Sequence, residues 1–328
     1  MEEASKPRMT DTPQAGAASA PAEPRRLQQL VDMARTYGPQ RMAVVHPVDP
    51  VSLIGAVEAA HQGLIIPVLV GPEARIREVA RTARIDLSPY TLVAADHAPL
   101  SAARAIELAR AGKVDALMKG ALHTDELMHP VVDPEHGLRT TRRVSHVFVI
   151  ETDRYPRLLF ITDAAVNIYP TLEDKRDIVQ NAIDLARTLG VQVPRVAILS
   201  AVELVTSRIK STIEAAALCK MADRGQIRGG VLDGPFAFDS AVSCEAAATK
   251  HIVSGVAGRA DILVVPDVEA GNMLAKQLEY LAGARLAGVV LGTRVPIVLT
   301  SRADDTRARL ASCAISVLMT HRKPPEAG

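Results

Sequence analysis

A polar cluster late in the chain has the residue types for chemistry on an anion. The run Ser301-Arg302-Ala303-Asp304-Asp305 follows directly on an apolar run that ends at Thr300. Ser301 or a neighbour would cap a following helix, and two acids suit the positive end of a helix dipole. Capping does not explain Arg302, because a cation is unfavourable at a helix N-terminus. The sequence therefore favours a bound anion beside Arg302.

Basic side chains also gather in two earlier loops. Lys119-Gly120 ends one apolar run and precedes His123. Its lysine could hold a phosphate as a point charge, or be a surface lysine before a turn glycine. Residues 137–143 carry Arg139, Arg142 and Arg143. Their guanidinium groups could fork onto phosphate oxygens, or could form a solvated basic loop.

An acid and an amide follow another apolar run. Asp163 and Asn167 come after the run that ends at Thr162. They could orient a ligand, or close a turn by bonding to backbone N–H groups. Ligands of α/β sheets bind beyond the carboxyl ends of the strands, so we expect these loops to hold the site.

Several other classes of site are excluded by motif and composition. The chain has no G-x-G-x-x-G after its first strand, no P-loop and no G-x-S-x-G, and His123 and His129 do not have the spacing of a zinc helix. A net charge of +1 and an aromatic content of 3% argue against nucleic acid or a membrane as partner. Three scattered cysteines fit a reducing cytoplasm, and the longest apolar runs are far too short to span a bilayer.

Alternating apolar runs and helical patterns predict an α/β fold. We expect strands at residues 41–46, 64–70, 91–95, 114–118, 144–150, 158–162, 196–200, 230–233, 262–266, 289–291 and 296–300. We expect helices at residues 51–61, 98–111, 172–189, 211–223, 271–281 and 304–321. Apolar strands alternating with helices indicate a mostly parallel sheet. A hairpin-like pair around Tyr155-Pro156 interrupts this pattern and is where a second domain could start.

Composition also predicts where the folded part lies. Residues 1–24 are rich in Ala, Pro, Ser and Thr, and we expect a disordered tail there, with a second tail at 322–328. The remaining chain divides into a first α/β domain, residues 25–143 plus 286–321, and a second α/β domain, residues 144–285.

Taken in order, the loops resemble the phosphate acetyl/butyryltransferase family. The runs that carry the resemblance are DALMKG at 115–120, GLRT at 137–140, SHVF at 145–148, ITDAAVNI at 161–168, KRDIVQNA at 175–182, VAILSAVE at 196–203, LDGP at 232–235, VPD at 265–267, GNMLAK at 271–276 and LTSRAD at 299–304. The likeness covers about residues 27–320. It is closer to the phosphate butyryltransferase branch, and to the acyltransferase half of bifunctional enoyl-CoA hydratase/phosphate acetyltransferases, than to typical acetyl enzymes.

This resemblance implies a fold, a reaction and an assembly. The implied fold has two α/β domains with a cleft between them, like isocitrate and isopropylmalate dehydrogenases, and the first domain is built from both ends of the chain. The implied reaction is acyl-CoA plus phosphate giving acyl phosphate plus CoA. A homodimer is implied, with CoA as a substrate and with no metal or bound cofactor.

The resemblance also implies roles for individual residues. Ser301 and Arg302 match the family's Ser-Arg pair, with Arg302 assigned to phosphate charge and Ser301 to the carbonyl or leaving group. The substrate-binding residues carried over or taken from the loops are Lys119, Gly120, His123, His129, Arg139, Arg142, Asp163, Asn167, Asn272 and Lys276.

Two positions depart from the family pattern. Acetyl enzymes have an Asp as the proposed base where this chain has Ala308, so Asp304 or Asp305 takes the role, or no such base is needed. His129 stands where the family often has Arg, so its charge near neutral pH would be partial. These departures are the support for a second hypothesis, a non-catalytic sensor of acyl-CoA or acyl phosphate on the same fold. A third, a decarboxylating dehydrogenase, lacks the metal-binding Asp clusters and cofactor site that it needs.

Overall fold

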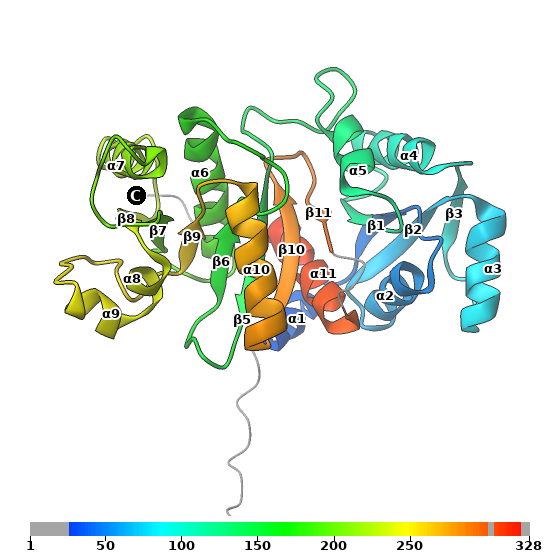
Figure 1. Ribbon diagram of the computed structural model, residues 1–328. Coiled ribbons are helices and arrows are strands. Elements are labelled where there is room, and N and C mark those ends of the chain that lie inside the picture. Colours follow the sequence, from blue (N-terminus) through cyan, green and yellow to red (C-terminus); the bar gives the residue numbers. More distant parts are fainter. Residues whose placement is uncertain (1–25, 301–304, 323–328) are drawn as a thin grey trace, which may run out of the picture.

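A continuous sheet forms the centre of the molecule, with helices on both of its faces (Figure 1). The structure is a computed structural model that describes residues 26–300 and 305–322. Within these residues eleven strands form one sheet in the order β3-β2-β1-β4-β11-β10-β5-β6-β9-β7-β8. The strands are β1 Gln40–Val45, β2 Ile65–Gly71, β3 Thr91–Ala94, β4 Ala116–Lys119, β5 Ser145–Glu151, β6 Leu159–Thr162, β7 Arg195–Leu199, β8 Val231–Phe236, β9 Ile262–Val264, β10 Arg285–Leu291 and β11 Ile297–Val298.

The helices divide between the two faces according to the core that they bury. One face carries α1 Arg26–Arg35, α2 Pro50–His61, α3 Glu73–Ala83, α6 Leu172–Thr188, α7 Lys210–Asp223 and α11 Thr306–His321. The other carries α4 Ala98–Arg110, α5 Thr124–Val131, α8 Phe238–Val242, α9 Cys244–Thr249 and α10 Val268–Ala282. Buried apolar side chains of these helices meet strands whose residues are themselves almost fully buried, which is typical of α/β proteins.

Antiparallel pairing at the centre joins two parallel groups of strands. β5 pairs antiparallel with β6 and with β10, and β10 pairs antiparallel with β11. The hairpin predicted around Tyr155-Pro156 is the connection between β5 and β6. All other strand pairs of the described sheet are parallel. The predicted α/β fold with a mostly parallel sheet and flanking helices is therefore confirmed.

The sheet runs through the predicted boundary between the two domains. β10 of the first predicted domain and β5 of the second share seven register pairs, from Arg285↔Glu151 to Leu291↔Ser145. On one face a single core cluster spans both halves. On the other face two separate clusters fill one half each. The division into two domains stays a prediction, and it corresponds to the second face only.

Several elements differ from the sequence-based prediction: helices α1, α3, α8 and α9 were not predicted, and strand β10 begins earlier than expected. Helix α3 was not predicted, because its surface is strongly charged and its buried residues are only Ile76 and Ala80. Strand β10 begins at Arg285, earlier than the predicted 289, because the small residues before Val289 hide the apolar run. Among them, Gly288 is required: a Cβ there would lie 2.3 Å from the carbonyl oxygen of Leu299.

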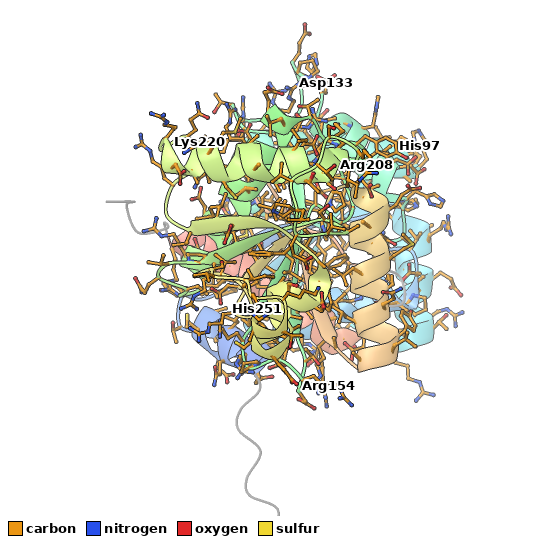
Figure 2. The ribbon with its side chains drawn as sticks, turned by 60° about the vertical axis from the view of Figure 1, so that its left-hand side comes forward. His97, Asp133, Arg154, Arg208, Lys220 and His251 are labelled. Carbon is orange, nitrogen blue, oxygen red and sulfur yellow. The ribbon has the colours of Figure 1, made fainter. Side chains whose placement is uncertain are left out.

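Charged side chains of both signs lie around the outside of the molecule. Figure 2 shows Asp133, Arg154 and Lys220 at its periphery, on different elements. In the part of the chain that the structure describes, no helix combines the length and apolarity needed to cross a membrane. Across those same ranges, no group of three or more His, Cys, Asp or Glu residues is placed to hold a metal ion.

One histidine is enclosed in the centre of the sheet. His146 of β5 is 0% exposed, and its ring contacts Phe148 edge to face with centroids 4.4 Å apart. Neither ring nitrogen has a hydrogen-bond partner of ordinary geometry among the described residues. Burial lowers the pKa of His146 to about 3, although the nearby carbonyl of Leu299 partly opposes the fall. The ring is therefore neutral near pH 7.

This buried imidazole predicts a pH-dependent stability. Since the unfolded chain binds a proton at His146 near pH 6.5 and the folded chain only near about pH 3, acidification favours unfolding. Stability should fall by up to about 1.4 kcal/mol per pH unit as the pH drops below 6.5. Urea unfolding at several pH values should show a smaller pH dependence for His146→Leu than for the wild type. Parallel curves for the two proteins would contradict the assignment.

Candidate active site

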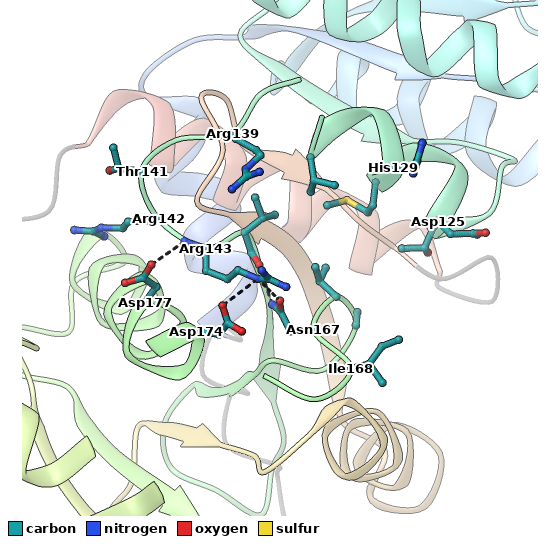
Figure 3. Close-up of a pocket in the computed structure, with 16 residues that line it drawn as sticks. Asp125, His129, Arg139, Thr141, Arg142, Arg143, Asn167, Ile168, Asp174 and Asp177 are labelled. Carbon is teal, nitrogen blue, oxygen red and sulfur yellow. Dashed lines mark hydrogen bonds and ion pairs between the residues drawn. The ribbon is translucent and has the colours of Figure 1, made fainter. Parts of the chain in front are cut away.

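A cavity of about 820 Å³ opens where β5 begins and β6 ends, beside helices α5 and α6. Figure 3 shows it between α5, the loop before β5, the loop after β6 and the start of α6. Its charged lining residues are Asp125, His129, Arg139, Arg142, Arg143, Asp174 and Asp177. A second cavity of about 610 Å³ lies between α4 and α5 and shares His129 with the first.

Strand register brings the two polar loops of the cavity together. β6 ends opposite the start of β5, with Thr162 paired to Val147. The loop that begins at Asp163 therefore lies beside the chain that enters β5 through Arg143. Sequence analysis identified both loops, and the antiparallel pairing of their strands is what makes them neighbours.

Asn167 lines the cavity and is held by Asp163 behind it, and both side chains are 3% exposed. The Asp163 carboxylate accepts the backbone N–H groups of Ala165 and Val166 at 3.0 Å and the amide of Asn167 at 2.5 Å. Burial raises the pKa of Asp163, while these donors act against the rise. Asp163 thus closes the turn, as one of the two alternatives raised by the sequence expected, while a role of these residues in orienting a ligand stays a prediction.

Asn167 orients an arginine that lines the cavity. Its Oδ1 accepts Nε of Arg143 at 2.7 Å, and its Nδ2 donates to the carbonyl oxygen of Val144 at 2.8 Å. Arg143 also lies 3.5 Å from Asp174 of α6, and its backbone N–H donates to Asp177 at 2.9 Å. Sequence analysis singled out Arg143 as one of three loop arginines but did not include it among the substrate-binding residues. Only the register of β5 and β6 shows that Arg143 lies at the cavity.

The three loop arginines differ in their partners. Arg142 forms an ion pair with Asp184 of α6, and Arg143 is held as described above. Arg139 is exposed, and no carboxylate among the described residues lies within ion-pair distance of its guanidinium. A backbone bridge between Arg139 and Thr293 fixes the base of its side chain. Arg139 therefore offers a positive charge to the cavity that the described protein does not itself neutralise.

The residues at the end of β4 position α5 and do not line the cavity. A Cβ at Gly120 would lie 2.3 Å from the carbonyl oxygen of Val45, so only glycine fits there. Lys119 is 5% exposed, with Nζ 3.5 Å from the carbonyl oxygen of Gly120. His123 precedes α5, and its backbone N–H donates to Glu126 at 2.7 Å. These contacts set the start of the helix that carries His129 to the cavity.

Two other predicted residues also lie outside the cavity. Asn272 of α10 donates to the carbonyl oxygen of Ala164 at 3.5 Å, which places it behind the loop after β6. Lys276 pairs with Glu279 at 2.8 Å and lies over the ring of Tyr280. The structure thus brings together His129, Arg139, Arg142 and Asn167 above Asp163, while Lys119, Gly120, His123, Asn272 and Lys276 stand apart.

The Ser-Arg cluster is described only at its end. Ser301, Arg302 and Asp304 lie outside the described residues. Asp305 is the N-cap of α11, and its carboxylate accepts the N–H of Ala308 at 2.8 Å. The cap of this helix is therefore Asp305, where the sequence favoured Ser301 or a neighbour.

Solved structures with this fold include acyltransferases. The branched-chain phosphotransacylase of Enterococcus faecalis V583 is 28% identical, with a TM-score of 0.76 over 86% of this chain and 99% of that one. The 4-hydroxythreonine-4-phosphate dehydrogenase of Klebsiella pneumoniae matches with a TM-score of 0.50 over 85% of this chain and 100% of that one, at 13% identity. The second match concerns the fold alone and agrees with the predicted dehydrogenase-like architecture.

The chain belongs to the family described as phosphate acetyl/butaryl transferase, whose model matches residues 100–317. It is 60% identical to the phosphate acetyltransferase of Rhizobium meliloti over 92% of this chain and 96% of that protein. It is 40% identical to the phosphate butyryltransferase of Clostridium beijerinckii over 90% of this chain and 97% of that protein. The resemblance drawn from the sequence is confirmed. Because relatives carry both names, and the acetyl one is the more similar of these two, the predicted butyryl branch stays a prediction.

The cavity predicts how ligand binding depends on Arg139. Arg139→Ala should leave the unliganded melting temperature nearly unchanged, because the side chain is exposed and no ion pair is lost. The stabilisation by phosphate or CoA, about 2.7 kcal/mol at a hundredfold excess over the dissociation constant, should shrink strongly. Thermal unfolding with and without each ligand measures this. Arg77→Ala on α3 is the control, and an unchanged ligand shift in Arg139→Ala would reject the site.

Proposed function

We propose that this chain transfers a short acyl group, acetyl or butyryl, between coenzyme A and inorganic phosphate. Acyl-CoA plus phosphate gives acyl phosphate plus CoA. The observation that carries the proposal is membership of the phosphate acetyl/butaryl transferase family over most of the chain. The Arg139 guanidinium in the cavity supports it, since inorganic phosphate, acyl phosphate and CoA all carry phosphate.

Chemistry at the acyl carbonyl is assigned to the Ser301-Arg302 cluster. With acyl phosphate as donor, the CoA sulfur attacks the carbonyl carbon, the S–C bond forms, and the C–O bond to phosphate breaks. Arg302 neutralises the charge on the departing phosphate, and Ser301 donates a hydrogen bond at the carbonyl or leaving group. Such positioned donors lower the barrier by stabilising charge as it develops.

The thiol proton goes to an acid in the same cluster. A free thiol has a pKa near 8.5, so CoA needs a base or cationic surroundings to become a thiolate. Asp304 is the better candidate of the two acids, because the Asp305 carboxylate is already engaged as the cap of α11. Ala308 cannot serve as a base. His129 contributes an imidazole to the cavity, and Arg139 supplies a guanidinium, which stays charged at every pH in the working range of proteins.

The non-catalytic sensor has no support among the relatives found. It rested on His129 and Ala308, and both are compatible with catalysis by the remaining residues. The dehydrogenase alternative shares the fold and nothing else observed. We propose further that the enzyme works in the cytoplasm without a resident metal or cofactor, with CoA entering as a substrate.

Thiol release tests the function. The wild type should release CoA thiol from acetyl-CoA or butyryl-CoA when phosphate or arsenate is present. Arg302→Ala should lower turnover about a hundred- to a thousandfold, and Arg302→Lys should also be strongly impaired because the planar fork is lost. Asp304→Asn should lower turnover strongly, whereas Asp305→Asn should cost about 1 kcal/mol or less of stability as a lost cap.

Circular dichroism confirms folding of each variant. A folded wild type that releases no thiol from either donor would reject the function. Wild-type turnover in Arg302→Ala would reject only the residue assignment. Full activity in both Asp variants would mean that the thiolate forms elsewhere.

A homodimer is also proposed, formed through the β8 end of the sheet. β8 is an edge strand of the described sheet, and apolar side chains are exposed around it: Leu204 78%, Ile213 44%, Val231 47% and Phe238 38%. Exposed apolar groups gathered beside an open strand edge favour association with a second copy.

Light scattering measures this assembly. The wild type should have twice the 35.0 kDa mass of one chain at micromolar concentration. The double variant Leu204→Glu with Ile213→Glu should shift toward the mass of one chain, because each carboxylate would be desolvated in the interface. Leu281→Glu, at an 86% exposed position on α10, is the control. A wild type of single-chain mass would refute the dimer.

A further inference from the structure

A buried arginine of α11 bonds to the residue that directly precedes the link carrying Ser301 and Arg302. Arg309, the fourth residue of α11, is 3% exposed, and its Nη1 donates to Oγ1 of Thr300 at 2.9 Å. Thr300 is also 3% exposed and directly precedes the link of residues 301–304. Asp305, which directly follows the link, is the N-cap of α11, and its carbonyl oxygen accepts the ordinary first helical hydrogen bond from the backbone N–H of Arg309 at 3.3 Å. The side-chain bond from Arg309 to Thr300 therefore ties the first turns of α11 to the chain that leaves β11.

The fold makes room for this arginine at a glycine of another helix. A Cβ at Gly55, inside α2, would lie 2.6 Å from Cδ of Arg309. Glycine inside a helix costs up to about 1 kcal/mol relative to alanine. Helix α2 therefore carries an unfavourable residue at the point where the Arg309 side chain passes.

Stability alone does not favour an arginine here. Burying a guanidinium takes it out of water, and a cation in the first turns of a helix opposes the helix dipole. Residues that cost stability and are still accommodated by their surroundings are typical of functional sites.

We propose that Arg309 is a positioning residue for acyl transfer: through Thr300 and the first turn of α11 it sets the separation that the Ser301–Asp304 link must span, and Gly55 provides the space for it. This inference rests on the proposed function, in which Ser301 and Arg302 act on the acyl carbonyl and the phosphate. Small displacements of such groups are costly, since misplacement by about 1 Å can lower a rate about a hundredfold.

Paired variants of Thr300 and Arg309 test the proposal. Thr300→Val removes the acceptor oxygen with little change of shape, and Thr300→Ser keeps it. We expect kcat for thiol release to fall about ten- to a hundredfold in Thr300→Val and in Arg309→Met. The fall in kcat in Thr300→Ser should be smaller by a factor of at least about five. The exposed Arg307→Met on the same helix is the matched control. The double variant should be no slower than the worse single variant, because both remove one contact.

Two further readouts separate positioning from general loss of structure. The thermal shift with CoA should persist in Thr300→Val and Arg309→Met, because the cavity residues are untouched. Gly55→Ala should lower kcat by displacing Arg309, and it should lower the melting temperature only modestly, because the gain in helix propensity partly offsets the overpacking.

The outcomes distinguish this inference from the function itself. An inactive wild type would reject the proposed function whatever the variants do. With an active wild type, equal kcat values in Thr300→Val and Thr300→Ser, or wild-type kcat in Gly55→Ala, would overturn the role of Arg309. If Arg309→Met does not fold, the Thr300 pair and Gly55→Ala decide the question.

Discussion

The antiparallel pairing of β5 with β10 and β6 is the constraint on which the molecule depends. Parallel strands on either side could each form a separate sheet. The seven register pairs between β5 and β10 join them into one described sheet. These seven pairs lie in buried strands, so the two halves cannot separate without losing buried backbone hydrogen bonds. A site between the halves is thereby held by main-chain geometry.

The same pairing explains how charge is arranged in the cavity. Because β6 ends beside the start of β5, the buried turn of Asp163 can present Asn167 to Arg143. Helix α6 then supplies acids to two of the three loop arginines, Asp174 near its start and Asp184 in its last turns. These pairs hold the loop while leaving Arg139 without a described carboxylate partner. An anion-binding protein needs both kinds of arginine, one group to shape the loop and one to meet the ligand.

Buried groups around β11 and the residues that follow it show a related compromise. His146 sits in the sheet with both ring nitrogens lacking described hydrogen-bond partners, and Gly288 is fixed by the carbonyl oxygen of Leu299. Arg309 is buried beside Thr300, which lies two residues after the end of β11. Costly groups thus surround the strand that leads into Ser301, in a fold that is otherwise apolar and tightly paired. Local cost of this kind is expected where geometry serves chemistry rather than stability.

The sequence by itself determined the fold class and the family, because apolar runs alternating with helical patterns allow few architectures and because many ordered motifs match. It also located the polar loops, including Arg139, Arg142, Asp163 and Asn167, since strand ends can be read from local pattern. Only the tertiary structure decided which of them meet. The sequence does not reveal that Lys119 is buried or that Lys276 pairs with Glu279, and a ligand role for either lysine stays a prediction. Arg143 and Arg309 owe their places to strand register and to space left by Gly55 on a distant helix, which are contacts between segments far apart in the chain. Such contacts leave no local signal, because burial and pairing depend on the partner segment as much as on the residue itself.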